Sequence, residues 1–106
     1  MTTLSLLDNT TFGTGHVEHV HLGGGGSVGN GLVDGLVTVT VSGKLYVPLI
    51  VETFDGNVWS TALTIKAAGS HSFTAAGAFA IRAALQGVNA PDANTTPTPV
   101  SVSAQF

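Results

Sequence analysis

Charged residues are scarce in this chain of 106 residues. Asp, Glu, Lys and Arg make up 8% of the sequence, with three basic and six acidic residues, whereas about 25% is typical of soluble domains. Three scattered cations cannot displace many counterions from phosphates, and they cannot form a polybasic membrane patch. We therefore expect no nucleic-acid or membrane partner. Because charge is depleted in the cores of protein interfaces, we expect neighbouring subunits to cover much of the surface.

Cysteine and long apolar segments are also absent. Without cysteine, neither disulfides nor thiolate metal sites can form. No apolar run approaches the roughly 18 residues that cross a bilayer. No basic segment followed by an apolar stretch marks a signal peptide. We therefore expect neither a membrane span nor a signal peptide.

A glycine-rich segment divides the chain into three predicted parts. Residues 23–31 read GGGGSVGNG, which is too much glycine for a regular element, and are predicted to form a hinge. Residues 1–22 form a predicted N-terminal arm with two short extended segments. Residues 32–106 form the predicted body, which is short enough to be a single domain.

The body shows the two-residue period of half-buried strands. Residues 37–42 read VTVTVS, and the chain closes on the same alternation over 100–106. Residues 45–54 are apolar at nearly every position, which favours a strand covered on both faces. Residues 55–56 are Asp-Gly, a hairpin turn signal. The alanine-rich segment 75–85 also suits a helix, but its period of two and its bracketing glycines favour a strand.

About seven short strands, separated by turns about every 8–12 residues, are typical of sandwiches and jelly rolls. We therefore predict an all-β fold, an antiparallel β-sandwich or jelly-roll-like body with an extended N-terminal arm. Residues 89–99 contain three prolines among polar residues. This stretch is predicted to be a long exposed loop.

The motifs of common enzyme active sites are missing. The sequence has no GxSxG, no P-loop and no GxGxxG that follows a strand, and the glycine run 23–26 lacks the Lys and Ser/Thr that phosphate binding needs. A triad of a serine, His71 and Asp55 can be assembled on paper, as in any small protein. We predict that the protein is not an enzyme and has no catalytic residues and no cofactor.

Three histidines cluster in the arm, in the sequence GHVEHVH over 15–21. On a strand, His19 and His21 share one face, and two imidazoles one residue apart can bind one metal ion. Two ligands from one chain make an incomplete site, whereas three chains around a three-fold axis would supply six ligands. Because HxH often arises by accident, we predict no metal site and interpret His16, His19 and His21 as polar groups at a subunit contact or in solvent. Their titration between about pH 5 and 7 would make assembly pH-dependent.

Two side chains of the body have alternative interpretations. Trp59 is in phase with the apolar residues of its own strand, which predicts an anchor in the core. The alternative is a stacking platform for a sugar. Arg82 is one of three cations, and we expect it to pair with Glu52 or Asp55 or to reach a neighbouring subunit.

Residues 44–106 carry an ordered series of turn and strand motifs. In order, these are VETFDGNVW (51–59), AAGS (67–70), AGAF (76–79), IRAALQG (81–87) and PVSVS (99–103). The series resembles that of small β-sandwich virion proteins of tailed bacteriophages. The resemblance implies a sandwich that decorates or stabilises a capsid or sits in the head–tail apparatus. It implies no catalytic residues.

We therefore hypothesise a non-enzymatic virion structural protein, a phage capsid decoration or cement protein at the capsid surface. Its partners would be copies of itself, in a homo-oligomer such as a trimer, and a capsid or other virion protein. The arm would latch onto a neighbour by strand addition. One alternative is another virion component, such as a head–tail protein or a tail spike or fibre subunit. Others are a carbohydrate- or host-surface-binding module that uses Trp59 or 89–99, and a metal-dependent spike or enzyme built on the arm histidines.

Overall fold

The fold is seen in a computed structural model of the chain, which describes residues 3–18 and 33–106. The described residues form eight strands: β1 (Thr3–Thr10), β2 (Thr14–Glu18), β3 (Val33–Ser42), β4 (Leu49–Phe54), β5 (Trp59–Ile65), β6 (Gly69–Ala78), β7 (Ala80–Leu85) and β8 (Val100–Gln105). Within these ranges no helix is long and apolar enough to cross a membrane.

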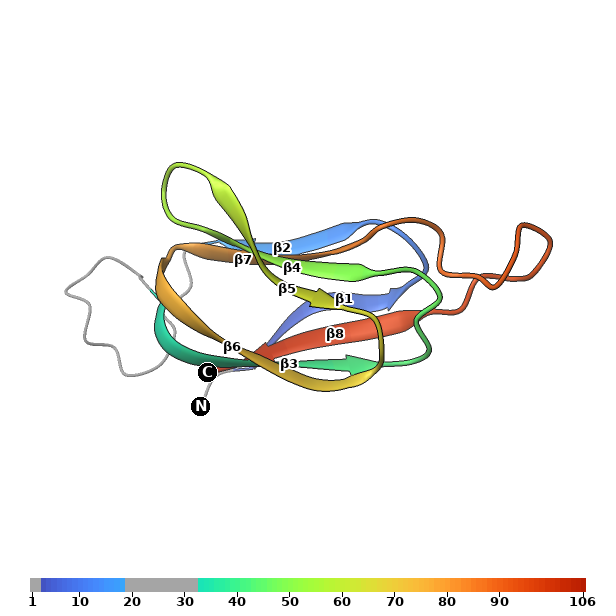
Figure 1. Cartoon of the computed structure of the whole chain (residues 1–106), viewed down its shortest axis with the longest axis horizontal. Helices are drawn as coiled ribbons and strands as arrows, with labels where there is room; N and C mark the ends of the chain where they lie inside the picture. The colour runs from blue at the N-terminus through green and yellow to red at the C-terminus, as the bar shows by residue number, and fades with distance from the viewer. Residues whose placement is uncertain (1–2, 19–32) are drawn as a thin grey trace.

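The strands form two antiparallel sheets. Sheet A has the order β1-β8-β3-β6, and sheet B has the order β2-β7-β4-β5 (Figure 1). Each strand pairs with its counterpart from the other end of the chain, β1 with β8, β2 with β7, β3 with β6 and β4 with β5. This is the arrangement of a jelly roll, a long hairpin rolled up into two facing sheets. The predicted all-β sandwich is confirmed.

The two extended segments predicted for the N-terminal arm are present as β1 and β2, and they pair within the sandwich. Residues 3–18 of the predicted arm supply β1 to sheet A and β2 to sheet B. Residues 3–18 are therefore part of the sandwich, whereas the predicted boundary at residue 32 lies outside the described residues. The main-chain groups that were assigned to a neighbouring copy pair instead with β8 and β7 of the same chain. The predicted hinge, 23–31, lies outside the described residues.

Aliphatic side chains from both sheets fill the space between them. Val37, Val39 and Val41 of β3 are buried, as are Leu49 and Val51 of β4 in the opposite sheet. The three valines are the residues that the two-residue period assigns to the inner face. In β4, which was expected to be covered on both faces, Leu49 and Val51 are buried and the residues that alternate with them are half-buried. The segment 75–85 is extended rather than helical, since it forms the end of β6 and all of β7. The predicted core phase of these strands is confirmed.

Gly15 lets β2 pass directly against β1 where the two sheets meet at one side. A Cβ at this position would overlap the carbonyl oxygen of Leu6, so only glycine allows this approach. On the β1 side, the register with β8 shifts between Ser5 and Leu7, which inserts one extra residue. As a result, both Leu6 and Leu7 are buried.

The hairpin turn predicted at Asp55–Gly56 joins β4 to β5. The Asp55 carboxylate accepts hydrogen bonds from the backbone N–H groups of Val58 (2.9 Å) and Asn57 (2.8 Å). These bonds favour the ionised form and lower the pKa of this exposed carboxyl below its usual value. Gly56 has φ +100°, a left-handed conformation that glycine adopts without strain. The prediction of this turn is confirmed.

Asn89 holds together the connections at one end of the sandwich, which we call the loop end (right in Figure 1). The side chain is fully buried. Its Nδ2 donates to the carbonyl oxygens of Lys44 and Thr98, and its Oδ1 accepts from the N–H of Tyr46, each at 2.7 Å. Its backbone N–H donates to the carbonyl of Thr11 at 2.9 Å. Through its side chain and its main-chain N–H, this one residue therefore links the β1–β2, β3–β4 and β7–β8 connections. Its burial differs from the exposed loop predicted for 89–99.

Replacing Asn89 with Asp should destabilise the fold by about 3–5 kcal/mol at pH 7, because a buried carboxylate would face two carbonyl oxygens. Burial raises the folded pKa of the new carboxyl above its unfolded value. The variant is therefore most stable, relative to wild type, below the unfolded pKa of about 3.9, and loses that stability as pH rises. Urea denaturation at pH 7 and pH 4, followed by circular dichroism, measures both effects.

The matched control is Asn94→Asp in the same loop, where the side chain is exposed. We expect this control to stay within about 0.5 kcal/mol of wild type. An Asn89→Asp variant as stable as the control at neutral pH would show that the buried amide does not hold the loop end.

Candidate functional site

The outer face of sheet A is covered by hydroxyl and amide side chains. In β3 and β8 the residues that alternate with the buried ones point away from the core. The register of β1 on β8 and of β6 on β3 places the outward side chains of these two strands on the same surface. We call it the Ser/Thr face, and it consists of Thr3, Ser5, Leu36, Thr38, Thr40, Ser42, Ser70, Ser72, Thr74, Ser101, Ser103 and Gln105.

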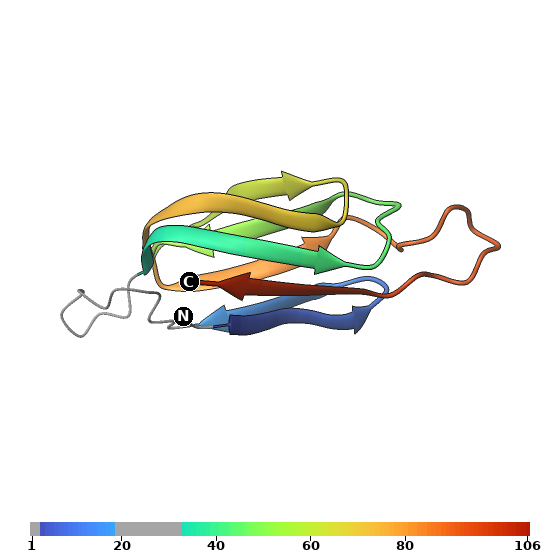
Figure 2. The ribbon, with the colours of Figure 1, turned by 90° about the horizontal axis from the view of Figure 1, so that it is seen from below.

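The four strands of sheet A lie side by side in the order β1-β8-β3-β6 (Figure 2). Their register arranges these side chains in rows across the sheet. The first row runs through Thr3, Gln105, Thr38 and Ser72, and the next through Ser5, Ser103, Thr40 and Ser70. Neighbours within a row are close enough to interact. The hydroxyl oxygens of Thr38 and Ser72, for example, lie 3.5 Å apart.

No residue of the Ser/Thr face carries a charge. Acidic residues stand at its two ends, Asp8 on β1 and Asp34 at the register position opposite Ala76. Leu36 is its large apolar residue, and it is 65% exposed. The residues of this face include no ion that would have to be desolvated on covering, and each hydroxyl can act as donor or acceptor toward the covering surface. The face is therefore suited to contact with another protein.

The outer face of sheet B is different, because it carries a charged and aromatic cluster. Arg82 on β7 and Glu52 on β4 are opposite each other in register. They form an ion pair with 2.8 Å between Nε and Oε1, and their side chains are 32% and 15% exposed. The guanidinium lies 4.1 Å from the centre of the Trp59 ring, and Phe54 lies 5.3 Å from that ring between centroids. Of the partners predicted for Arg82, Glu52 is the one observed.

Trp59 lies outside the buried core cluster, so its prediction as a core anchor is wrong. The register of β5 on β4 shifts by one residue at Ala62. Such a bulge reverses which side chains point inward. Leu63 and Ile65, after the bulge, therefore face the core, whereas Trp59, before it, stacks on Arg82. Because the guanidinium occupies one face of the indole, that face cannot stack on a sugar.

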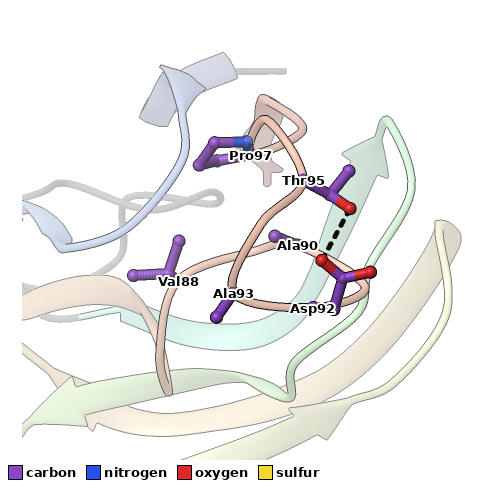
Figure 3. A pocket seen from close by; sticks show the side chains of 6 residues that line it. All are labelled: Val88, Ala90, Asp92, Ala93, Thr95 and Pro97. Atoms are coloured by element: carbon purple, nitrogen blue, oxygen red, sulfur yellow. Dashed lines mark hydrogen bonds between the residues drawn. The ribbon is translucent and has the colours of Figure 1, made fainter.

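The β7–β8 connection encloses a hollow at the loop end (Figure 3). Its volume is about 430 Å³, and it is lined by Val88, Ala90, Asp92, Ala93, Thr95 and Pro97. The Asp92 carboxylate accepts hydrogen bonds from the Thr95 hydroxyl and the Asn94 N–H, each at 2.8 Å. These bonds lower its pKa, and they direct the carboxylate into its own loop. The lining offers neither an aromatic ring nor a cation to a ligand.

The predicted histidine candidates are not brought together in the described structure. His16 lies on β2 opposite Arg82 in register, whereas His19 and His21 lie outside the described residues. Within 3–18 and 33–106, no three His, Asp or Glu residues are grouped so as to hold a metal ion. The histidine and the aspartate of the hypothetical catalytic triad are also far apart along the fold. His71 lies at the start of β6, with Nε2 3.0 Å from the carbonyl oxygen of Ala67, and Asp55 lies in the turn at the other end of β5.

No protein family, curated protein or solved structure matches the chain. The resemblance of residues 44–106 to phage virion proteins therefore stays a prediction.

The position of Trp59 outside the core is tested by comparing the stability cost of removing Trp59 with that of removing a core residue. Leu49 is fully buried, so Leu49→Ala should cost about 2–5 kcal/mol. Trp59→Ala removes one cation–π and one aromatic contact, and should cost about 1–2 kcal/mol. Urea denaturation followed by circular dichroism compares the two. A Trp59→Ala variant as unstable as Leu49→Ala would mean that the tryptophan anchors the core after all.

Proposed function

We propose that this protein is a non-enzymatic virion structural protein that decorates and cements the capsid of a tailed bacteriophage. The Ser/Thr face carries the proposal. It extends over all four strands of sheet A and lacks the Lys, Arg and Glu that normally keep a soluble surface from associating. A surface of this kind is suited to being covered by a neighbouring subunit.

The composition of the whole chain supports the same conclusion. With 8% charged residues, the chain has little to oppose close packing with other subunits, and interface cores are depleted in charge in the same way. The resemblance of residues 44–106 to phage virion sandwiches favours a phage particle as the assembly in which the subunits pack. A jelly roll is common among viral capsid domains, although the fold alone does not assign a function.

The mechanism is passive. Each copy places its Ser/Thr face on the shell and exchanges hydrogen bonds between hydroxyls and the polar groups of the capsid protein. One such contact is modest, because each hydrogen bond replaces one made to water. Many copies on one particle gain avidity, since a second contact within the same lattice forms at high effective concentration. The shell is thereby held together without any chemical step.

The carbohydrate-binding alternative has weaker support. Sugar sites combine an aromatic platform with several polar groups. Arg82 covers one face of the Trp59 ring, and the hollow in the β7–β8 connection has no aromatic residue in its lining. Neither of the two places suggested for a sugar combines both features.

The proposal is tested on particles of the phage or prophage whose genome encodes the chain. We expect quantitative mass spectrometry of purified particles to find this chain in a copy number comparable to that of the shell protein. Particles grown without its gene should bind the recombinant chain on co-sedimentation and should resist heat or low salt better once it is bound. Particles that contain no copy of the chain would contradict the proposal.

Two lysine variants test which surface makes the attachment. Ser5→Lys puts a charge on the Ser/Thr face, and Thr64→Lys puts one on sheet B. Both residues are exposed and lie on edge strands. We expect at least a tenfold loss of binding for Ser5→Lys, because a buried unpaired charge costs more than the roughly 1.4 kcal/mol that corresponds to tenfold. Thr64→Lys should bind as wild type does. The reverse result would place the contact on sheet B.

A further inference from the structure

Sheet A ends at β6, and no strand within 3–18 or 33–106 pairs with its outer edge. Edge strands present unpaired N–H and C=O groups, and they are normally protected by charges, prolines, bulges or short length. β6 is ten residues long and has the sequence GSHSFTAAGA, with neither a charged residue nor a proline. Its register on β3 is continuous from Gly69 to Ala76, and the shift in that register falls beyond Ala76, at the far end.

The other three edges of the described sheets each have protection. β1 has two register shifts and contains Asp8. β2 is five residues long and ends at Glu18. β5 is bulged at Ala62 and is followed at once by Lys66. β6 is therefore the edge of this sandwich at which strand addition meets the least opposition.

We infer that β6 pairs antiparallel with β6 of a second copy of this chain, so that the two copies of sheet A join into one continuous sheet. Around a two-fold axis, a residue near the axis meets itself or a close neighbour in the partner copy. A charged residue would meet its like and repel it. A hydroxyl both donates and accepts, so it complements itself. A strand without Asp, Glu, Lys or Arg whose outward residues include Ser70, Ser72 and Thr74 is suited to this kind of contact.

The side chains of β6 also fit such a pairing. Ser70, Ser72 and Thr74 lie on the Ser/Thr face, whereas Phe73 packs against the core from the edge. Registers that keep the two outer faces aligned place the axis on a residue of the strand, such as Ser72 or Phe73. Serine and threonine then meet across the axis, as Thr38 and Ser72 already do within one chain at 3.5 Å. The partner strand would also cover the exposed edge of Phe73.

The dimer would double the width of the Ser/Thr face that is proposed to contact the capsid. The inference of a dimer does not depend on that proposed function. Dimerisation is measured on the purified chain and capsid attachment on particles. Either one can therefore fail while the other stands.

The first experiment measures mass in solution by sedimentation equilibrium over a range of protein concentrations. We expect wild type to approach twice the 10.7 kDa of one chain as concentration rises. Ser72→Lys should stay at the mass of one chain at every concentration, because its charge would lie beside its own copy across the axis. At a protein concentration where wild type is monomeric, the variant should unfold within about 0.5 kcal/mol of wild type. The control Ser60→Lys, an exposed serine on edge strand β5, should dimerise as wild type does. A wild type that is monomeric throughout, or a dimer that Ser72→Lys leaves unchanged, overturns the inference.

The second experiment locates the axis and uses the absence of native cysteine. Single cysteines are placed along 70–75 and oxidised, and covalent dimer is quantified on a denaturing gel. Antiparallel pairing predicts that cross-linking peaks at one residue and falls on both sides of it. The matched scan at Thr61 and Thr64 on β5 should give only background cross-linking. A flat profile along β6, or a stronger signal from β5, would place the contact elsewhere and overturn the inference.

Discussion

The two-residue alternation of β3 and β8 is the constraint on which the rest of this structure depends. It directs Val37, Val39 and Val41 into the core and, by the same geometry, directs Thr38 and Thr40 outward. Because the two central strands of sheet A contain only Ser, Thr and Gln at the outward positions of their shared ladder, the uncharged composition of the chain becomes a continuous uncharged surface. The core and the uncharged outer face of sheet A thus follow from one pattern of alternation.

The pairing of distant strands places the remaining features on this frame. The first and last strands lie side by side, which brings residues near the two ends of the described chain onto one face. An ion pair with its aromatic neighbours lies on the opposite sheet, where Arg82 pairs with Glu52 and stacks on Trp59. At the loop end, the buried side chain of Asn89 links the β3–β4 and β7–β8 connections, and its main-chain N–H adds the β1–β2 connection. The molecule therefore has one polar uncharged face and one face with paired charges.

Much of this could be predicted from the sequence, and the failures have physical reasons. Strict alternation identified the strands of the body, and Asp-Gly identified the β4–β5 turn. Trp59 was misplaced because the extra residue at Ala62 reverses the phase, and a bulge has no strong signature in one strand alone. Asn89 was assigned to solvent because its burial depends on three connections that converge from distant parts of the chain. The strand pairing of residues 3–18 depends on partners more than 60 positions away, which local patterns do not reveal.

Hydroxyl-radical footprinting of the chain, free and bound to capsids, tests the central claim most directly. Each outer face carries one reactive reporter: Leu36 lies on the Ser/Thr face and is 65% exposed, and Trp59 lies over Arg82 on sheet B. Our account predicts that oxidation of Leu36 falls on binding while that of Trp59 is unchanged. Protection of Trp59 with Leu36 still fully reactive would show that the uncharged face of sheet A is not the surface on which this protein assembles.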